Sequence, residues 1–172
     1  MPLFLDACAL AKRYIPEGQS TRRMQEITGR FDRWGGFAVS SLIEPEVISA
    51  FARHARAQAP HEEHHYRKHS RVVDAFRRDL SLPVFTIIPV TDEEVEAAAD
   101  LLRAHLEYAI GAADAIHLAT ALALMAQERP EPLVFVTADK GLAEAAREKG
   151  LTVFNPLYQG PEELERIVGT GR

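Results

Sequence analysis

The chain has 172 residues, of which 47% are apolar and 26% charged, and its net charge is −5, so we expect one globular domain. The single cysteine, Cys8, excludes an intramolecular disulfide framework and a cysteine-rich zinc site. Neither an apolar run of membrane-spanning length nor the basic region of a secretory leader is present, which favours a cytoplasmic protein without a membrane partner. Lys and Arg outnumber Asp and Glu in residues 1–79, which permits a surface that binds polyanions.

In the first half of the chain, short apolar runs alternate with helical patterns. The apolar runs predict buried strands, and apolar residues at helical spacing predict helices that end at Gly or Pro. In chain order, the expected elements are a strand at 2–5, helices at 7–14 and about 20–28, a strand at 37–40, and helices at 47–55 and 61–80. We interpret residues 53–80 as a helical arm of the same domain.

The second half of the chain continues this alternation. Thr91 precedes three acidic residues, which predicts an N-cap and an acidic first turn, and Gly150 fits a helix C-cap. In chain order, the expected elements are a strand at 84–90, helices at 91–108 and 112–127, a strand at 133–137, a helix at 140–149, a strand at 151–154 and a weak helix at 161–168. The pattern predicts an α/β fold with a parallel sheet, in one domain over residues 1–160 and a C-terminal tail at 161–172.

Four acidic residues fall where strands end or helices begin: Asp6, Glu46, Asp114 and Asp139. The carboxyl ends of parallel strands are where such sheets bind ligands. Two unit charges 4 Å apart repel by about 4 kcal/mol at an effective dielectric constant of 20, so convergence of these acids would need a hard cation such as Mg²⁺ or Mn²⁺. The spacing of these residues in the sequence does not by itself show whether the four carboxylates lie together.

Each of these acids also fits an ordinary structural role. Asp6 and Asp139 suit helix N-caps, and Asp114 suits the positive end of a helix dipole. Glu46 competes with Glu44, because Ser41 and Glu44 fit a capping box, although Pro45 complicates that box.

Four motifs in order resemble those of the PIN-domain ribonucleases, and in particular the VapC-type toxins of type II toxin–antitoxin systems. The resemblance covers nearly the whole chain and rests on residues 3–12 (LFLDACALAK), 41–50 (SLIEPEVISA), 113–121 (ADAIHLATA) and 135–142 (FVTADKGL), with Asn155-Pro156 at the closing strand. It implies a PIN-like three-layer α/β/α fold with a central, mostly parallel sheet. One residue departs from the family pattern, because Cys8 stands where a Ser or Thr is usual.

The resemblance also implies an activity and its partners. The activity is that of a metal-dependent endoribonuclease in which Asp6, Glu46, Asp114 and Asp139 hold one or two Mg²⁺ or Mn²⁺ ions. The partners are an RNA substrate, a cognate antitoxin and a second copy of the chain in a homodimer. Two alternatives remain at this point: a PIN-fold binding module weakened through Cys8, and an α/β phosphatase or phosphotransfer domain with Asp6 as nucleophile.

Several further residues are open to a functional or a structural interpretation. Thr137 orients Asp139 or a phosphate, or is a plain strand residue, and His117 aids catalysis or packs in its helix. Lys12 and Arg13 contact phosphates or form a solvated face.

The histidines spaced for a transition metal are His61, His65 and His69, with His64 beside them. The basic residues of the arm, which bind RNA or a partner or are only solvated, are Arg53, Arg56, Arg67, Lys68, Arg71, Arg77 and Arg78. The apolar residues expected in the core or a dimer interface are Leu118, Leu122 and Met125, and Leu101 and Leu102 are expected in the core.

Overall fold

A computed structural model describes residues 3–58, 63–127 and 133–169, apart from the side chains of 63–66 and 68. Its five described strands form one sheet in the order β3-β2-β1-β4-β5, and every pair of neighbours is parallel. The strands are β1 (Leu3–Leu5), β2 (Phe37–Ser40), β3 (Phe85–Ile88), β4 (Val134–Val136) and β5 (Thr152–Phe154). The expected α/β class with a central parallel sheet is confirmed.

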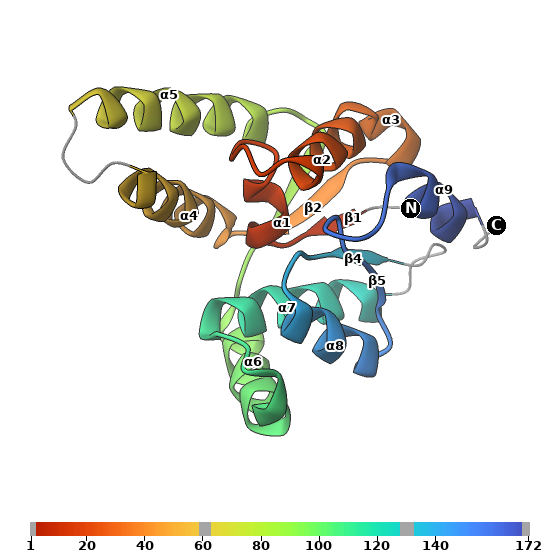
Figure 1. The fold of residues 1–172 in the computed structure, drawn as a ribbon. Helices are drawn as coiled ribbons and strands as arrows, with labels where there is room; N and C mark the ends of the chain where they lie inside the picture. The colour runs from red at the N-terminus through yellow and green to blue at the C-terminus, as the bar shows by residue number, and fades with distance from the viewer. Residues whose placement is uncertain (1–2, 59–62, 128–132, 170–172) are drawn as a thin grey trace.

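Helices cover both faces of the sheet (Figure 1). One face carries α1 (Ala7–Ala11), α2 (Gln19–Gly29), α3 (Phe31–Trp34), α4 (Ile43–Gln58), α5 (Glu63–Leu80) and α9 (Pro161–Gly169). The other carries α6 (Asp92–Ala104), the 3₁₀ helix η1 (Leu106–Tyr108), α7 (Ala112–Ala126) and α8 (Lys140–Glu148). Strand side chains alternate between the two cores: Leu3 and Leu5 join the first, and Phe4 joins the second. No helix in the described ranges is long and apolar enough to cross a membrane.

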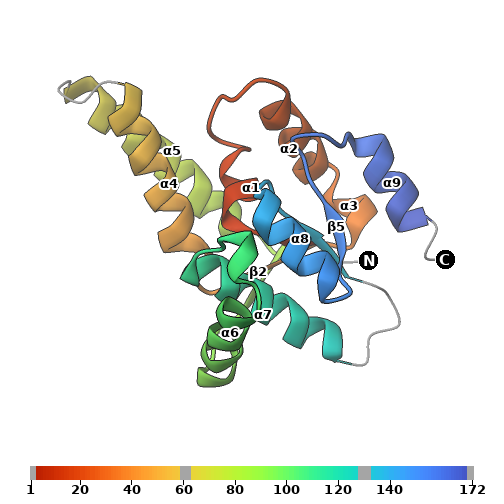
Figure 2. The same cartoon turned by 60° about the horizontal axis from the view of Figure 1, so that its bottom comes forward.

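The expected arm is a pair of helices, α4 and α5, which lie side by side and project from the rest of the fold (Figures 1 and 2). Three aromatic rings pack at its base, with edge-to-face centroid separations of 5.6 Å for Tyr14–Phe51 and Tyr14–Phe76 and 5.9 Å for Phe51–Phe76. Asp79 accepts hydrogen bonds from Tyr14 Oη at 2.8 Å and from Arg13 Nε at 3.2 Å. These contacts anchor the arm beside α1.

The main differences from the sequence prediction are the ends of two helices and one additional helix. The helix expected to reach Tyr14 ends at Ala11, and α3 was not expected at all. The helix expected to reach Tyr108 ends at Ala104, because the chain continues as η1 and then turns at Ala109, whose φ of 51° is left-handed. The weak helix expected at 161–168 is present as α9, and its Leu164 is fully buried against the first core.

Candidate metal centre

The topology brings the first and last predicted acids to neighbouring strand ends. β1 and β4 are paired, with Leu5 opposite Val136, and the later strands lie on either side of them. Asp6 follows β1 directly, and Asp139 is the N-cap of α8 just after β4. Ligand sites in open parallel sheets lie at the point where the strand order reverses, and this is that point.

Asp6 is fully buried, and both of its oxygens are hydrogen-bonded. Oδ1 accepts from the backbone N–H of Ala7 at 2.7 Å, so the N-cap role exists. Oδ2 accepts from Thr137 Oγ1 at 2.9 Å and from Cys8 Sγ at 2.6 Å. Burial raises the pKa of Asp6 above its ordinary value, and these hydrogen bonds only partly offset that effect.

Thr137 connects Asp6 to Asp139. Its hydroxyl donates to Asp6 and accepts from the backbone N–H of Asp139 at 3.1 Å. One buried threonine on the strand end therefore orients both acids.

Cys8 fills the position where the family pattern has a hydroxyl. Its Sγ lies 3.3 Å from Thr137 Oγ1 and accepts from the backbone N–H of Ala138 at 3.2 Å. Burial, followed by the negative charge of Asp6, raises the pKa of the Cys8 thiol well above its usual range. The sulfur is therefore a neutral donor to Asp6 and not a nucleophile.

Asp139 and Asp114 each use one oxygen to cap a helix. Asp139 Oδ1 accepts from the backbone N–H of Leu142 at 2.7 Å, and Asp114 Oδ2 accepts from that of Gly111 at 3.0 Å. Within the described residues, the second oxygen of each carboxylate makes no hydrogen bond. The structural and ligand roles of these residues are thus compatible.

Asp114 lies within electrostatic reach of both other aspartates. Its pKa is raised, first by burial and then by the negative charges of Asp6 and Asp139. The ion pairs found in the described part of the chain include none of these three carboxylates, nor Glu46. Within the described residues, no Lys or Arg side chain therefore forms an ion pair with this cluster.

The structure separates Glu46 from its competitor Glu44. Glu44 accepts a hydrogen bond from Arg77 Nε on α5 at 2.8 Å, and the helix begins at Ile43, with Pro45 in the first turn where no N–H is needed. Glu46 lies instead near His117, because its negative charge acts to raise the pKa of that ring. The negative charges of Glu46 and Asp114 therefore act on the same histidine.

His117 is fully buried and hydrogen-bonds through Nδ1 to Ser40 Oγ at 2.8 Å. Burial lowers its pKa despite the neighbouring acids, so the ring is neutral at pH 7. Ser40 also accepts from the backbone N–H of Leu42 at 3.2 Å, which joins the end of β2 to the start of α4. Ser40, which sequence reasoning missed, is therefore a positioning residue for His117, and His117 Nε2 is buried without a hydrogen-bond partner among the described residues.

Gly141 is a second residue that sequence reasoning missed. A Cβ atom there would lie 2.1 Å from the backbone oxygen of Tyr108, so only glycine lets η1 approach the first turn of α8. Because of this close approach, the segment from η1 to Asp114 lies beside α8, the helix that Asp139 caps. An isolated glycine inside a helical pattern was the signal for it.

The remaining basic and histidine candidates lie outside this cluster. Lys12 pairs with Glu17, and Arg13 with Asp79. The arm's described cations at exposed positions are Arg53, Arg56, Arg67, Arg71, Arg77 and Arg78, whereas the Lys68 side chain lies outside the described residues. His61 and the side chains of His64 and His65 also lie outside them, and His69 lines a cavity of about 100 Å³ between α4 and α5. Leu101 and Leu118 are core residues, Leu102 and Leu122 are partly buried against that core, and Met125 is 39% exposed.

Comparison with known proteins decides the family. A family model described as PIN domain matches residues 3–148. The chain belongs to the PIN-domain family. This confirms the resemblance found in the sequence, and PIN domains are generally nucleases that use divalent metals.

Solved structures share the PIN fold at low sequence identity. FitAcB from Neisseria gonorrhoeae matches with a TM-score of 0.57 and 19% identity, over 91% of this chain and 99% of that chain. VapBC2 from Rickettsia felis, bound to a promoter DNA fragment, matches with a TM-score of 0.58 and 16% identity, over 90% and 98%. A toxin–antitoxin complex from Klebsiella pneumoniae matches with a TM-score of 0.53 and 19% identity, over 90% and 97%. A comparison with curated proteins finds no match.

The donor set of this PIN domain fits a hard divalent cation. Carboxylate oxygens suit Mg²⁺ and Mn²⁺, and Asp114 and Asp139 each keep one oxygen without a hydrogen bond in the described part of the chain. Burial first, and then the negative charges of Asp6 and Asp139, raise the pKa of Asp114, and a cation would neutralise those charges.

Proposed function

We propose that this PIN domain is a divalent-metal-dependent endoribonuclease that acts as the toxin of a toxin–antitoxin pair. The observation that supports this proposal is the contact of Thr137 with two of the acids at the paired ends of β1 and β4: its hydroxyl donates to Asp6 at 2.9 Å and accepts from the backbone N–H of Asp139 at 3.1 Å. Asp6, Asp114 and Asp139 would hold Mg²⁺ or Mn²⁺, and Glu46 would complete the site from the side of His117.

The residues of this chain would prepare the site before substrate arrives. Asp6 is held by Thr137 and Cys8, Asp139 by Thr137 and its helix cap, and Asp114 by Gly111. Such fixed ligands need little rearrangement during the reaction, which favours catalysis. When bound, the cation supplies Lewis-acid chemistry, which activates water for attack on phosphorus and offsets the negative charge that develops there.

RNA would be attracted by positive charge outside the acidic cluster. Exposed arginines of the arm, including Arg53, Arg67 and Arg71, supply such charge on α4 and α5. Contacts of this kind bind the phosphate backbone without reading sequence and weaken as salt rises. The cleavage point would then depend on RNA shape and exposed bases.

The partners follow from the structural neighbours and from the exposed apolar side chains. Solved neighbours include a complex of a toxin with its antitoxin, and we propose a cognate antitoxin for this chain. Met125 on α7 and Val95 on α6 are exposed, at 39% and 48%, and a second copy of the chain would cover such residues in a homodimer. We place this activity in the cytoplasm, where RNA substrates and a co-expressed antitoxin occur together.

RNA cleavage tests the proposal directly. The purified chain, free of any partner, is incubated with total bacterial RNA and Mg²⁺, and new RNA ends are mapped by sequencing. We expect reproducible cleavage sites with the wild type and at least about a hundredfold fewer with Asp6→Asn or Asp139→Asn, because each removes a charge that holds the cation.

The control variant is Asp100→Asn, which removes an exposed carboxylate on α6 that pairs only with Arg103 in the described structure and should keep full activity. Cleavage that survives in Asp139→Asn or in excess EDTA would contradict the proposal. Cleavage by no variant, in a wild type that binds Mn²⁺, would instead support a non-catalytic PIN-fold binding module.

A further inference from the structure

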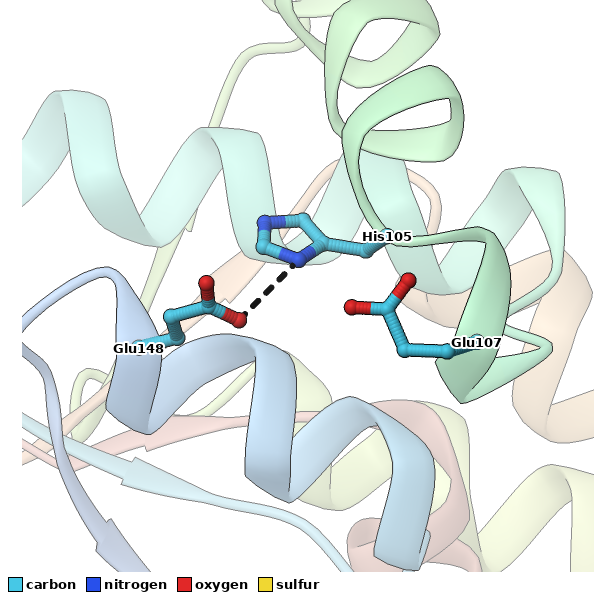
Figure 3. Close-up of side chains that lie close together, drawn as sticks. All are labelled: His105, Glu107 and Glu148. Atoms are coloured by element: carbon cyan, nitrogen blue, oxygen red, sulfur yellow. Dashed lines mark ion pairs between the residues drawn. The ribbon is translucent and has the colours of Figure 1, made fainter.

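A second group of metal-ligating side chains lies at the far end of α8 from Asp139. His105 is the C-cap of α6, Glu107 lies in η1, and Glu148 is the last residue of α8. One ligand atom from each side chain lies within 4.8 Å of the other two (Figure 3). The nine-residue α8 is about 13 Å long, so Glu148 lies one helix length away from Asp139.

The histidine of this group is buried without a hydrogen-bond partner. Its side chain is 3% exposed, and Nδ1 points toward both carboxylates, 3.3 Å from Glu148 Oε2 (Figure 3). Neither ring nitrogen makes a hydrogen bond to any residue that the structure describes. Buried polar atoms nearly always have a hydrogen-bond partner, so an imidazole without one, whose Nδ1 has only an ion-pair contact with Glu148, points to a missing ligand.

The surroundings of these side chains also favour a cation. The helices α6 and α8 both end here, and helix C-termini carry partial negative charge. Tyr108 stacks on His105 with a centroid separation of 5.6 Å, and its hydroxyl donates to Glu148 Oε2 at 3.1 Å. Hydrogen bonds of this kind orient metal ligands in known sites.

We propose that His105, Glu107 and Glu148 bind one transition-metal cation of the Zn²⁺ class. One imidazole nitrogen with two carboxylates suits such an ion better than Mg²⁺, which prefers oxygen alone. Ligands about 2.1 Å from a tetrahedral ion lie roughly 3.4 Å apart, close to the separation of His105 Nδ1 and Glu148 Oε2. Both glutamates are exposed, so they can move onto the ion, and a water takes the fourth position.

Binding here would tie the corner between α6 and η1 to the end of α8. The same corner leads through Ala109 to Gly111 and Asp114, so the ion would stiffen the segment that positions one acid of the carboxylate cluster.

Cobalt titration tests the site, because Co²⁺ substitutes for Zn²⁺ and gives visible absorption bands that depend on its ligands. The full chain is used without an affinity tag, and Zn²⁺ then displaces the Co²⁺. We expect one equivalent of high-affinity binding, weakened at least about tenfold in both Glu107→Gln and Glu148→Gln. Zn²⁺ should raise the melting temperature of the wild type and of neither variant.

Two controls separate this site from others in the chain. Glu96→Gln changes an exposed carboxylate on α6 outside the group and should bind Co²⁺ like the wild type. Asp139→Asn, which alters the carboxylate cluster, should leave these bands unchanged. Absence of binding in the wild type, or wild-type affinity in Glu107→Gln or Glu148→Gln, would overturn the proposal.

Discussion

At the residue scale, the Cys8 thiol makes the hydrogen bonds beside Asp6 that a hydroxyl group would make. Cys8 donates to the Asp6 carboxylate and accepts from the Ala138 backbone, while its pKa stays well above the usual range because the group is buried beside a negative charge. A serine at this position can make the same two contacts, whereas an alanine can make neither. The departure from the family pattern therefore preserves the local hydrogen bonding.

This comparison predicts the behaviour of two Cys8 variants. Cys8→Ser should keep the Mn²⁺ affinity within a few-fold, and Cys8→Ala should lose about tenfold, because Asp6 then lacks one of its orienting donors. Isothermal titration calorimetry measures both. Equal affinities for the serine and alanine variants would show that the side chain at this position does not orient Asp6.

The charge of the cluster predicts how stability without metal depends on pH. Asp6 and Asp114 have an ordinary carboxyl pKa of 3.8 when unfolded, and burial raises both in the folded protein. Above pH 3.8 the folded chain thus holds more protons than the unfolded chain, so these groups make the free energy of unfolding fall as pH rises toward their folded pKa values. This decrease in the free energy of unfolding is complete when both carboxyl groups are ionised in the folded protein.

Asp114→Asn should remove part of this decrease in the free energy of unfolding at high pH. Its amide oxygen can still accept from Gly111, so the capped helix is kept while one of three clustered charges is removed. In EDTA at pH 7, we expect the variant to be more stable than the wild type by on the order of 1 kcal/mol, with the gap closing toward pH 4. Urea unfolding measures this. A variant that is less stable at pH 7 would argue against repulsion among the aspartates.

At the element scale, close approach of η1 to α8 shapes one side of the site. The space for that approach depends on Gly141, since an added Cβ would meet the Tyr108 backbone oxygen at 2.1 Å. Gly141→Ala should destabilise the protein by about 1–3 kcal/mol, through the shift it forces on η1 or α8. It should also weaken Mn²⁺ binding, because Asp139 and Asp114 flank this contact.

The matched control is Gly29→Ala in α2, where an added Cβ would meet no atom within 4 Å. This variant should be neutral or slightly more stable, because alanine favours helix over glycine. Thermal unfolding compares the two. Similar stability for both variants would mean that η1 and α8 can separate at little cost.

Much of the element order was accessible from sequence, and the exceptions have physical causes. The apolar runs of the strands and the acidic first turn of α6 are local signals, and they gave the right order of strands and long helices. The end of α6 was predicted four residues too late, because the left-handed turn at Ala109 uses a residue that normally favours helix. That turn is held by tertiary contacts of η1, and no local sequence signal predicts it.

At the scale of the whole molecule, the parallel sheet makes the candidate site from residues far apart in the chain. Motif spacing identified Asp6, Glu46, Asp114 and Asp139, and the sheet order brings three of them within electrostatic reach. The contacts that orient them, such as Thr137 with Asp6 across 131 positions, could not be predicted, since they depend on which strands are neighbours. Glu44 remained a competitor until its contact with Arg77 on α5 was known.

Residues of α9, beyond residue 160, also contribute to the first core. Leu164 of α9 is fully buried, and Glu165 pairs with Arg30 and Arg33 beside α2. Leu164→Ala should therefore destabilise the protein by about 2–4 kcal/mol, whereas Leu157→Ala, at a position 39% exposed, should change stability by no more than about 0.5 kcal/mol. Urea unfolding compares them, and a neutral Leu164→Ala would show that α9 is a dispensable tail.

The central claim is that the aspartates at the ends of β1 and β4 bind a divalent cation, and Mn²⁺ calorimetry tests it most directly. The wild type, Asp6→Asn and the surface control Asp100→Asn are titrated under the same conditions after their folding has been checked by circular dichroism. We predict saturable binding in the wild type and in Asp100→Asn, and its loss in Asp6→Asn. Equal binding in all three proteins, or none in the folded wild type, would contradict the assignment of this cluster as a metal centre.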